Sequence, residues 1–141
     1  MRQLVSVLVK QIPVCVQLHS SEGRGVLEGC LVAAMETVND DALLKKMNID
    51  ILMHTRSEEA SVRLLSLTCS TALWRTHGGK LLGRCLLWDH VAASVSDFFA
   101  GLVAETATFI TECAEDDNDS VVQEAHHLKD AVESVAGKID V

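Results

Sequence analysis

The chain has 141 residues, of which 48% are hydrophobic and only 4% aromatic, with a single proline and no tyrosine. This composition favours one domain of helices packed through Leu, Val and Ala, and argues against a β-sandwich. The net charge of −8 arises in residues 102–141, which hold ten acidic and two basic side chains, whereas the rest of the chain is balanced. Nucleic-acid phosphates require clustered Lys and Arg, so direct nucleic-acid binding is not expected.

No apolar run approaches the roughly 20 residues of a membrane span, and Lys10 interrupts the apolar start of the chain. We therefore expect a soluble protein with no membrane contact. The cysteines lie in apolar helical contexts and are odd in number, which predicts reduced, buried thiols in an intracellular protein. They are Cys15, Cys30, Cys69, Cys85 and Cys113.

The first apolar stretch, residues 4–18, is ambiguous. Its alternate valines suit a strand, whereas the spacing of Leu4, Leu8 and Ile12 suits a helix that ends or kinks at Pro13, and we predict the helix. Residues 20–25, SSEGRG, are predicted to form a loop.

Two helices are expected next. The first has apolar residues at Leu27, Leu31, Ala34, Met35 and Val38. The polar run over residues 39–41 should end this helix and cap the following one, whose inner face is predicted to hold Leu44, Met47, Ile51 and His54.

The stretch 56–83 is predicted to be the central helix. Ser57 suits an N-cap, and two acidic residues after it complement the helix dipole. Apolar rows on two faces indicate burial between neighbouring helices. The rows are Leu64, Leu67, Thr71 and Trp74, and Val62, Leu65, Cys69 and Leu73. Gly78-Gly79 is expected to end the helix.

Residues 84–101 are predicted to be an insertion or connector, with an amphipathic pattern at Leu87, Val91, Val95 and Phe98. A helix should follow with Val103, Ala107, Ile110 and Ala114 inward, and then an acidic turn over 115–119. The last helix has the clearest stripe, Val121, Ala125, Leu128, Val132 and Val135, and Gly137 should close it.

The central and last helices share their rhythm at an offset of 61 residues, from Leu64 to Ala125. Removing the 18 residues of 84–101 reduces this offset to 43, inside the roughly 40–47 residues of HEAT and armadillo units. The predicted fold is all-α: a HEAT/armadillo-like antiparallel helical stack, the C-terminal end of an α-solenoid, with 1–141 as one domain. The expected structural core includes Leu64, Leu67, Trp74, Leu128 and Val132.

Motifs for catalysis or metal binding are incomplete. The run 77–80, HGGK, lacks the first glycine and the Ser or Thr of a phosphate loop. The acidic run 116–119 lacks the glycine and glutamate of a calcium loop. His126, His127 and Cys113 have no further zinc-motif spacing around them. We expect no catalytic, cofactor or metal site; the alternative is a small helical metal-binding or enzymatic domain that uses Cys and His.

Two long strings carry a family resemblance: TRSEEASVRLLSLTCSTALWRTHGGKLLG at 55–83 and LVAETATFITECAEDDNDSVVQEAHHLKDAVESVAGKID at 102–140. They resemble the C-terminal region of the large HEAT-repeat subunit of the small-subunit processome, a nucleolar complex on precursor ribosomal RNA and a small nucleolar RNA, with fungal members most similar. In that family GGKLLG runs almost directly into VAETATFI, so 84–101 departs from its pattern as a real insertion or a translated intron.

The resemblance implies a non-catalytic scaffold that supports ribosomal RNA processing in the nucleolus and contacts other processome proteins. The residues add that an acidic face should attract basic protein segments and repel RNA, so that nucleic acid would associate indirectly. The candidate partner-binding residues are Glu112, Asp116, Asp117, Asp119, Glu124, Asp130 and Glu133.

Overall fold

The computed structural model describes residues 2–17, 21–38, 40–86 and 92–139. The helices are α1 (Arg2–Val9), α2 (Gln11–Gln17), α3 (Ser21–Thr37), α4 (Asp41–Leu52), the 3₁₀ turn η1 (Met53–Arg56), α5 (Ala60–Leu86), α6 (Ala92–Ala114) and α7 (Asp119–Ala136). These ranges contain no β-strand, so the all-α prediction is confirmed. No helix within them is long and apolar enough to cross a membrane.

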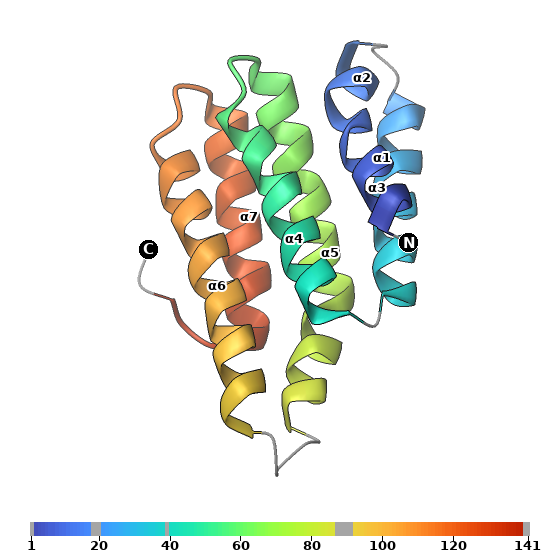
Figure 1. Ribbon diagram of the computed structural model, residues 1–141. Helices are drawn as coiled ribbons and strands as arrows, with labels where there is room; N and C mark the ends of the chain where they lie inside the picture. Colours follow the sequence, from blue (N-terminus) through green and yellow to red (C-terminus); the bar gives the residue numbers. More distant parts are fainter. Residues whose placement is uncertain (1, 18–20, 39, 87–91, 140–141) are drawn as a thin grey trace.

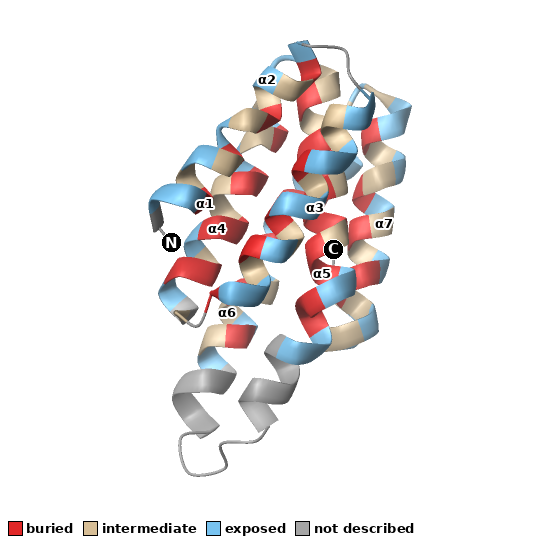
Figure 2. Cartoon of the chain, turned by 90° about the vertical axis from the view of Figure 1, so that its right-hand side faces the viewer, coloured by how far each residue is buried: buried red, intermediate tan, exposed pale blue. Residues whose placement is uncertain are grey.

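The helices form two layers of a stack (Figure 1). One layer runs α1, α4, α6 and the other runs α3, α5, α7, with each helix packed on its neighbour in the layer. Figure 2, which faces the α1–α3 end, shows the layers side by side. Successive antiparallel pairs therefore cover one another's apolar faces, which is the arrangement of a HEAT-like solenoid.

The predicted first helix is divided, and its break precedes Pro13. α1 ends at Val9, and Pro13 lies in the first turn of α2. Proline has no N–H and its ring clashes with the carbonyl four residues earlier, which here belongs to Val9.

The predicted loop over 20–25 is wrong for its described residues, because α3 begins at Ser21 and includes Gly23 and Gly25. The polar break before α4 is correct: the carboxylate of Asp40 caps α4 by accepting from the Leu43 N–H at 3.2 Å. Residues 18–20 and 39 lie outside the described ranges.

The predicted end of the central helix at Gly78-Gly79 is also wrong, since α5 continues to Leu86. The start is near the predicted place: Ser57 Oγ accepts from the Glu59 N–H at 3.3 Å, and α5 begins at Ala60. α5 lies between α3, α4 and α7 and is buried on several sides, as its two apolar rows indicate.

The predicted core positions occupy the centre of the stack. Leu67, Trp74, Leu128 and Val132 are at most 3% exposed, whereas Leu64 is only partly buried at the edge of the core. The inward face of α6 is offset from the predicted stripe: Leu102, Thr106, Phe109, Ile110 and Cys113 are buried, whereas Ala114 is exposed.

Both ends of the segment 84–101 are helical, because α5 reaches Leu86 and α6 begins at Ala92. Of its amphipathic pattern, Leu87 and Val91 lie outside the described residues, the side chain of Val95 is not described, and Phe98 is partly buried. Phe99 is buried, and its ring meets that of Trp74 edge-on with centroids 6.2 Å apart. Phe99, near the end of this segment, therefore belongs to the core.

α7 follows its predicted pattern. Asn118 caps it by accepting from the N–H groups of Ser120 and Val121. Gly137 ends it with a φ of 82°, a left-handed conformation that favours glycine, and donates to the Glu133 carbonyl. Val135, the last member of the stripe, is only partly buried.

Candidate interaction surface

The turn between α6 and α7 is fastened to the start of α5 by Arg63. Its Nε and Nη2 donate to the two oxygens of Asp116, both at 2.7 Å, and Nη2 also donates to Asp117 at 2.8 Å. Its Nη1 donates to the carbonyls of Ser57 and Glu58, each at 3.0 Å. All the donor groups of this guanidinium are therefore engaged.

This cluster is partly shielded from water. The side chains of Arg63 and Asp116 are only 12% and 10% exposed. The hydrogen bonds from Arg63 lower the pKa of the Asp116 carboxyl, and those to Asp116 raise the pKa of the guanidinium. Asp116, a candidate partner-binding residue in the sequence, is thus a structural anchor and does not lie on the outer surface.

A second Arg–carboxylate pair joins η1 to α6. Arg56 donates through Nε and Nη2 to Glu112 at 2.9 and 2.7 Å, and its guanidinium lies 4.8 Å from the centroid of the Phe109 ring. The pairing lowers the pKa of Glu112 through the hydrogen bonds from Arg56. Both side chains are about half exposed, so solvent screens this pair and its contribution to stability is small.

Two further acidic candidates on α7 make hydrogen bonds, one within the helix and one to the segment that follows it. Glu124 lies 3.0 Å from His127 Nδ1, and Glu133 accepts from the backbone N–H of Ile139 at 3.2 Å. The remaining candidates are more accessible. Asp119 and Asp130 are exposed on α7, and Asp117 is 91% exposed although it also contacts Arg63.

The outer face of α7 is polar along its length, and its exposed residues are Asp119, Ser120, Gln123, His126, Asp130 and Ser134. The α6–α7 turn adds Asp117, which is exposed beside Asp119 at one end of this face. We call Asp117, Asp119 and Asp130 the acidic face. It is the part of the predicted acidic surface that remains available to a partner.

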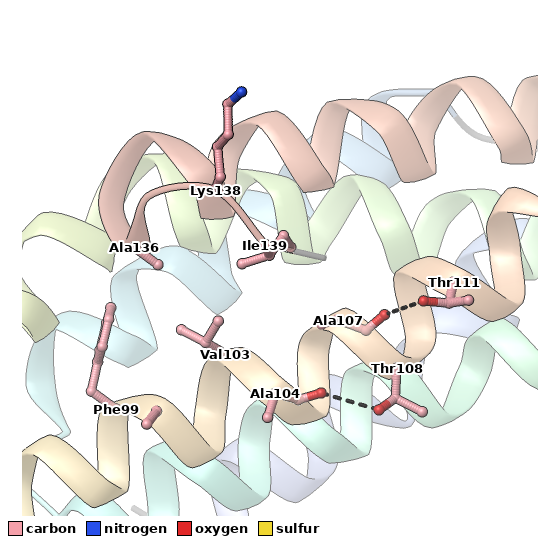
Figure 3. A pocket seen from close by; sticks show the side chains of 10 residues that line it. Phe99, Val103, Ala104, Ala107, Thr108, Thr111, Ala136, Lys138 and Ile139 are labelled. Atoms are coloured by element: carbon pink, nitrogen blue, oxygen red, sulfur yellow. Dashed lines mark hydrogen bonds between the residues drawn. The ribbon is translucent and has the colours of Figure 1, made fainter. Parts of the chain in front are cut away.

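An open groove of about 600 Å³ lies between α6 and the segment after α7 (Figure 3). Phe99, Val103 and Ala107 form its α6 side, and Ile139 folds back over it. The hydroxyls of Thr108 and Thr111 donate to the carbonyls of Ala104 and Ala107 in their own helix. The groove is lined mainly by apolar and small side chains and offers no catalytic constellation.

The described thiols do not gather into a reactive site. Cys69 and Cys113 are buried, and burial raises the pKa of both, that of Cys69 to about 12. Cys30 is exposed and Cys15 is partly buried, whereas the side chain of Cys85 is not among those that the structure describes. Within the described ranges no three His, Cys, Asp or Glu side chains are placed to hold a metal ion. His127, considered for zinc, pairs with Glu124.

Sequence reasoning found the acidic residues but missed Arg56 and Arg63. The two arginines precede their carboxylate partners by more than 50 residues, so no local spacing connects them. One feature of the sequence could have indicated the role of Arg63. It is a basic residue among the apolar residues in the first turns of the central helix, and a buried charge needs a partner.

The chain is similar to proteins from fungi and an insect. It is 24% identical over 131 residues, 93% of its length, to the U3 small nucleolar RNA-associated protein 10 of Pyricularia oryzae. It is 26% identical over 121 residues, 86% of its length, to the protein of that name from Mycosarcoma maydis. It is 24% identical over 135 residues, 96% of its length, to the HEAT repeat-containing protein 1 homolog of Drosophila melanogaster.

No protein-family profile and no solved structure matches the chain. The chain spans only 5–6% of the length of these curated relatives. The similarity nevertheless covers almost all of the described helices and extends beyond the fungal proteins. The name of one relative, which refers to HEAT repeats, is consistent with the helical stack seen in this chain.

Proposed function

We propose that the chain is a non-catalytic scaffold module in ribosome biogenesis, which supports precursor ribosomal RNA processing and small-subunit assembly in the nucleolar small-subunit processome. The observation that carries this proposal is its similarity, over 86–96% of its length, to relatives named for U3 small nucleolar RNA or for HEAT repeats. The two-layer helical stack supports it, because such stacks present extended docking surfaces.

The acidic face is the proposed contact for partners. Asp119 and Asp130 are exposed on α7, and the excess negative charge of the chain lies in the same segment. This charge repels RNA phosphates and attracts Lys- or Arg-rich protein segments, over a Debye length of about 8 Å at physiological salt. The partners are therefore basic segments of other processome proteins, and RNA associates indirectly.

The test is recovery of processome proteins from nucleolar extract by the tagged chain and by the double variant D119N/D130N. The matched control is E28Q/E36Q, which removes two acidic charges from α3 at the other end of the stack. We expect D119N/D130N to recover several-fold less of these proteins and E28Q/E36Q to recover as much as the unmodified chain. The recovery should also fall as salt rises.

Two results would contradict the proposal. One is equal recovery by the two double variants, because it would exclude the acidic face as the contact. The other is binding of the purified chain to U3 small nucleolar RNA or precursor ribosomal RNA with an affinity that D119N/D130N leaves unchanged. Melting temperatures of both variants establish that any loss of binding is not a loss of folding.

A further inference from the structure

The two ends of the stack differ in how much of their apolar surface is exposed. At the α1–α3 end, four large hydrophobic side chains are 41–61% exposed: Leu4, Val7, Val14 and Val26. At the α6–α7 end, no large hydrophobic side chain is exposed among residues 97–139, whose side chains the structure describes. The groove side of α6 nevertheless carries Phe99 and Val103, so something at this end covers them.

The cover is the segment 137–139, which we call the strap. Gly137 ends α7 with a φ of 82° and turns the chain back toward α6. A β-carbon on Gly137 would meet nothing within 4 Å, so glycine is needed here for its backbone conformation and not for space. After the turn, Lys138 points away from the groove, whereas Ile139 lies over it (Figure 3).

One residue of α7, Glu133, holds the strap at two points. Its backbone carbonyl accepts from the N–H of Gly137 at 3.0 Å, and its carboxylate accepts from the N–H of Ile139 at 3.2 Å. A hydrogen bond to an ionised carboxylate is stronger than one to a neutral acceptor. Glu133 is a candidate partner-binding residue in the sequence, but these two bonds make it the anchor of the strap.

Ile139 packs where the groove is most apolar. It is partly buried against the hydrophobic core, as is Val103 on the facing side of α6. Phe99 and Val103 are the large apolar side chains of this wall, and its other members are alanines and threonines. The hydroxyls of Thr108 and Thr111 already donate to carbonyls of α6. The strap therefore shields the part of α6 that has the most apolar area to bury.

The strap is held more weakly than the helices around it. Among the described residues, its hydrogen bonds are the two to Glu133, and its apolar contact is the single side chain of Ile139. A segment with so few contacts opens locally at a far smaller free-energy cost than global unfolding. Opening uncovers Phe99 and Val103 and leaves α6 and α7 in place.

We propose that the strap gates the groove on α6: when it is closed it shields α6 from apolar groups, and when it opens α6 becomes accessible to them. Glu133 is the residue that keeps it closed. This inference goes beyond the scaffold function and does not rest on it, because it concerns contacts within this chain alone. The gate also uses none of the residues of the acidic face.

Fluorescence of the dye anilinonaphthalene sulfonate, which binds exposed apolar surface, measures how far the strap is open. I139S should raise the fluorescence of the purified full chain by about threefold or more, because it removes the side chain that covers the groove. E133A should raise it by less, because it removes one of two anchoring hydrogen bonds. K138S is the matched control, since Lys138 is the neighbouring strap residue and points away from the groove, and it should not raise the fluorescence.

A second substitution locates the dye. I139S/A107E places a carboxylate on the α6 side of the groove and should return the fluorescence to that of the unmodified chain, because the dye is an anion. Melting temperatures establish that the variants are folded, and E133A, which removes no apolar contact, decides the question if I139S is not. Fluorescence that neither I139S nor E133A raises above that of K138S would overturn the proposal. Equal dye binding by I139S/A107E and I139S would also overturn it, because the dye would then report apolar surface elsewhere in the chain.

Discussion

Val135 of α7 packs so closely on Gly78 of α5 that a β-carbon on Gly78 would lie 2.8 Å from Val135 Cγ2. The same β-carbon would lie 3.3 Å from Cε3 of Trp74. Gly78 is therefore a site of close helix contact within α5, where the absence of a side chain lets α7 approach. Gly79, the next residue, faces open space, with nothing within 4 Å of its would-be β-carbon.

Alanine substitutions at these two glycines should have opposite effects. G79A should stabilise the chain by about 0.5–1 kcal/mol, because alanine is the better helix former in the interior of a helix. G78A should destabilise it, because Val135 is stiff at χ1 and must move to admit the methyl group. Urea unfolding of both variants measures the difference.

The double variant G78A/V135A is the control, because it removes the methyl groups that the new β-carbon meets. It should lose less stability than the sum of the two single variants. A stabilising G78A, equal to G79A, would mean that α5 and α7 do not approach as closely as described.

The ring contact between Trp74 and Phe99 indicates whether the segment 84–101 is needed for the stability of the fold. On sequence alone, the deletion that joins Gly83 to Leu102 should fold at least as stably, because it restores the repeat period. The structure places Phe99 in the core, so we now expect this deletion and F99A each to destabilise the chain, F99A by about 3 kcal/mol. Thermal unfolding monitored by circular dichroism tests this, and full stability of the deletion would show that Phe99 is replaceable.

The Arg63 cluster should contribute more to stability than the Arg56 pair. R63A should cost on the order of 2 kcal/mol, because it leaves the shielded carboxylate of Asp116 and two backbone carbonyls without their donor. R63K should recover only part of this, because an ammonium lacks the planar fork that binds a carboxylate with two parallel bonds. R56A is the control, because Arg56 forms a similar pair with Glu112 that is about half exposed. It should lose clearly less stability than R63A. Equal losses for R63A and R56A in urea unfolding would contradict the role of Arg63.

The lowered pKa of Asp116 predicts a specific loss of stability in acid. The carboxyl has an ordinary pKa of 3.8 in the unfolded chain and a lower one when paired with Arg63. The contribution of the Asp116 carboxylate to the stability of the folded chain is complete at pH values above the pKa of the unfolded chain. It declines as pH falls through the folded pKa, because the unfolded state binds the proton first. Melting temperatures between about pH 5 and pH 2 should fall less in D116N than in the unmodified chain. Parallel curves would show that Asp116 is not the group that titrates.

Much of the fold could be predicted because its signals are local. The stripe from Val121 to Val132 follows the helical period, and Asp40 and Gly137 occupy positions typical of their residue types at helix ends. These features depend on neighbours within one or two turns, which the sequence displays directly.

The errors came from residues whose role is set by distant contacts. A glycine pair usually ends a helix, but Gly78 meets Val135, which is far away in sequence. The acidic residues were predicted to face solvent, but Asp116 meets Arg63 across 53 positions. The sequence shows that the acidic residues are concentrated in residues 102–141. It does not show which of their carboxylates pair with basic residues and which stay accessible, because this depends on how α5 packs on the α6–α7 turn.

Zero-length carbodiimide crosslinking of the chain in nucleolar particles, combined with ultraviolet crosslinking to RNA, tests most directly whether the acidic face binds a protein. Carbodiimide joins a carboxylate only to an amine in direct contact with it. We expect Asp119 and Asp130 to join to lysines of a processome protein, and residues 102–139 to give no specific RNA crosslinks. Specific RNA crosslinks in that segment, without any carboxylate–lysine crosslink to a protein, would mean that this face binds RNA and not a basic protein segment.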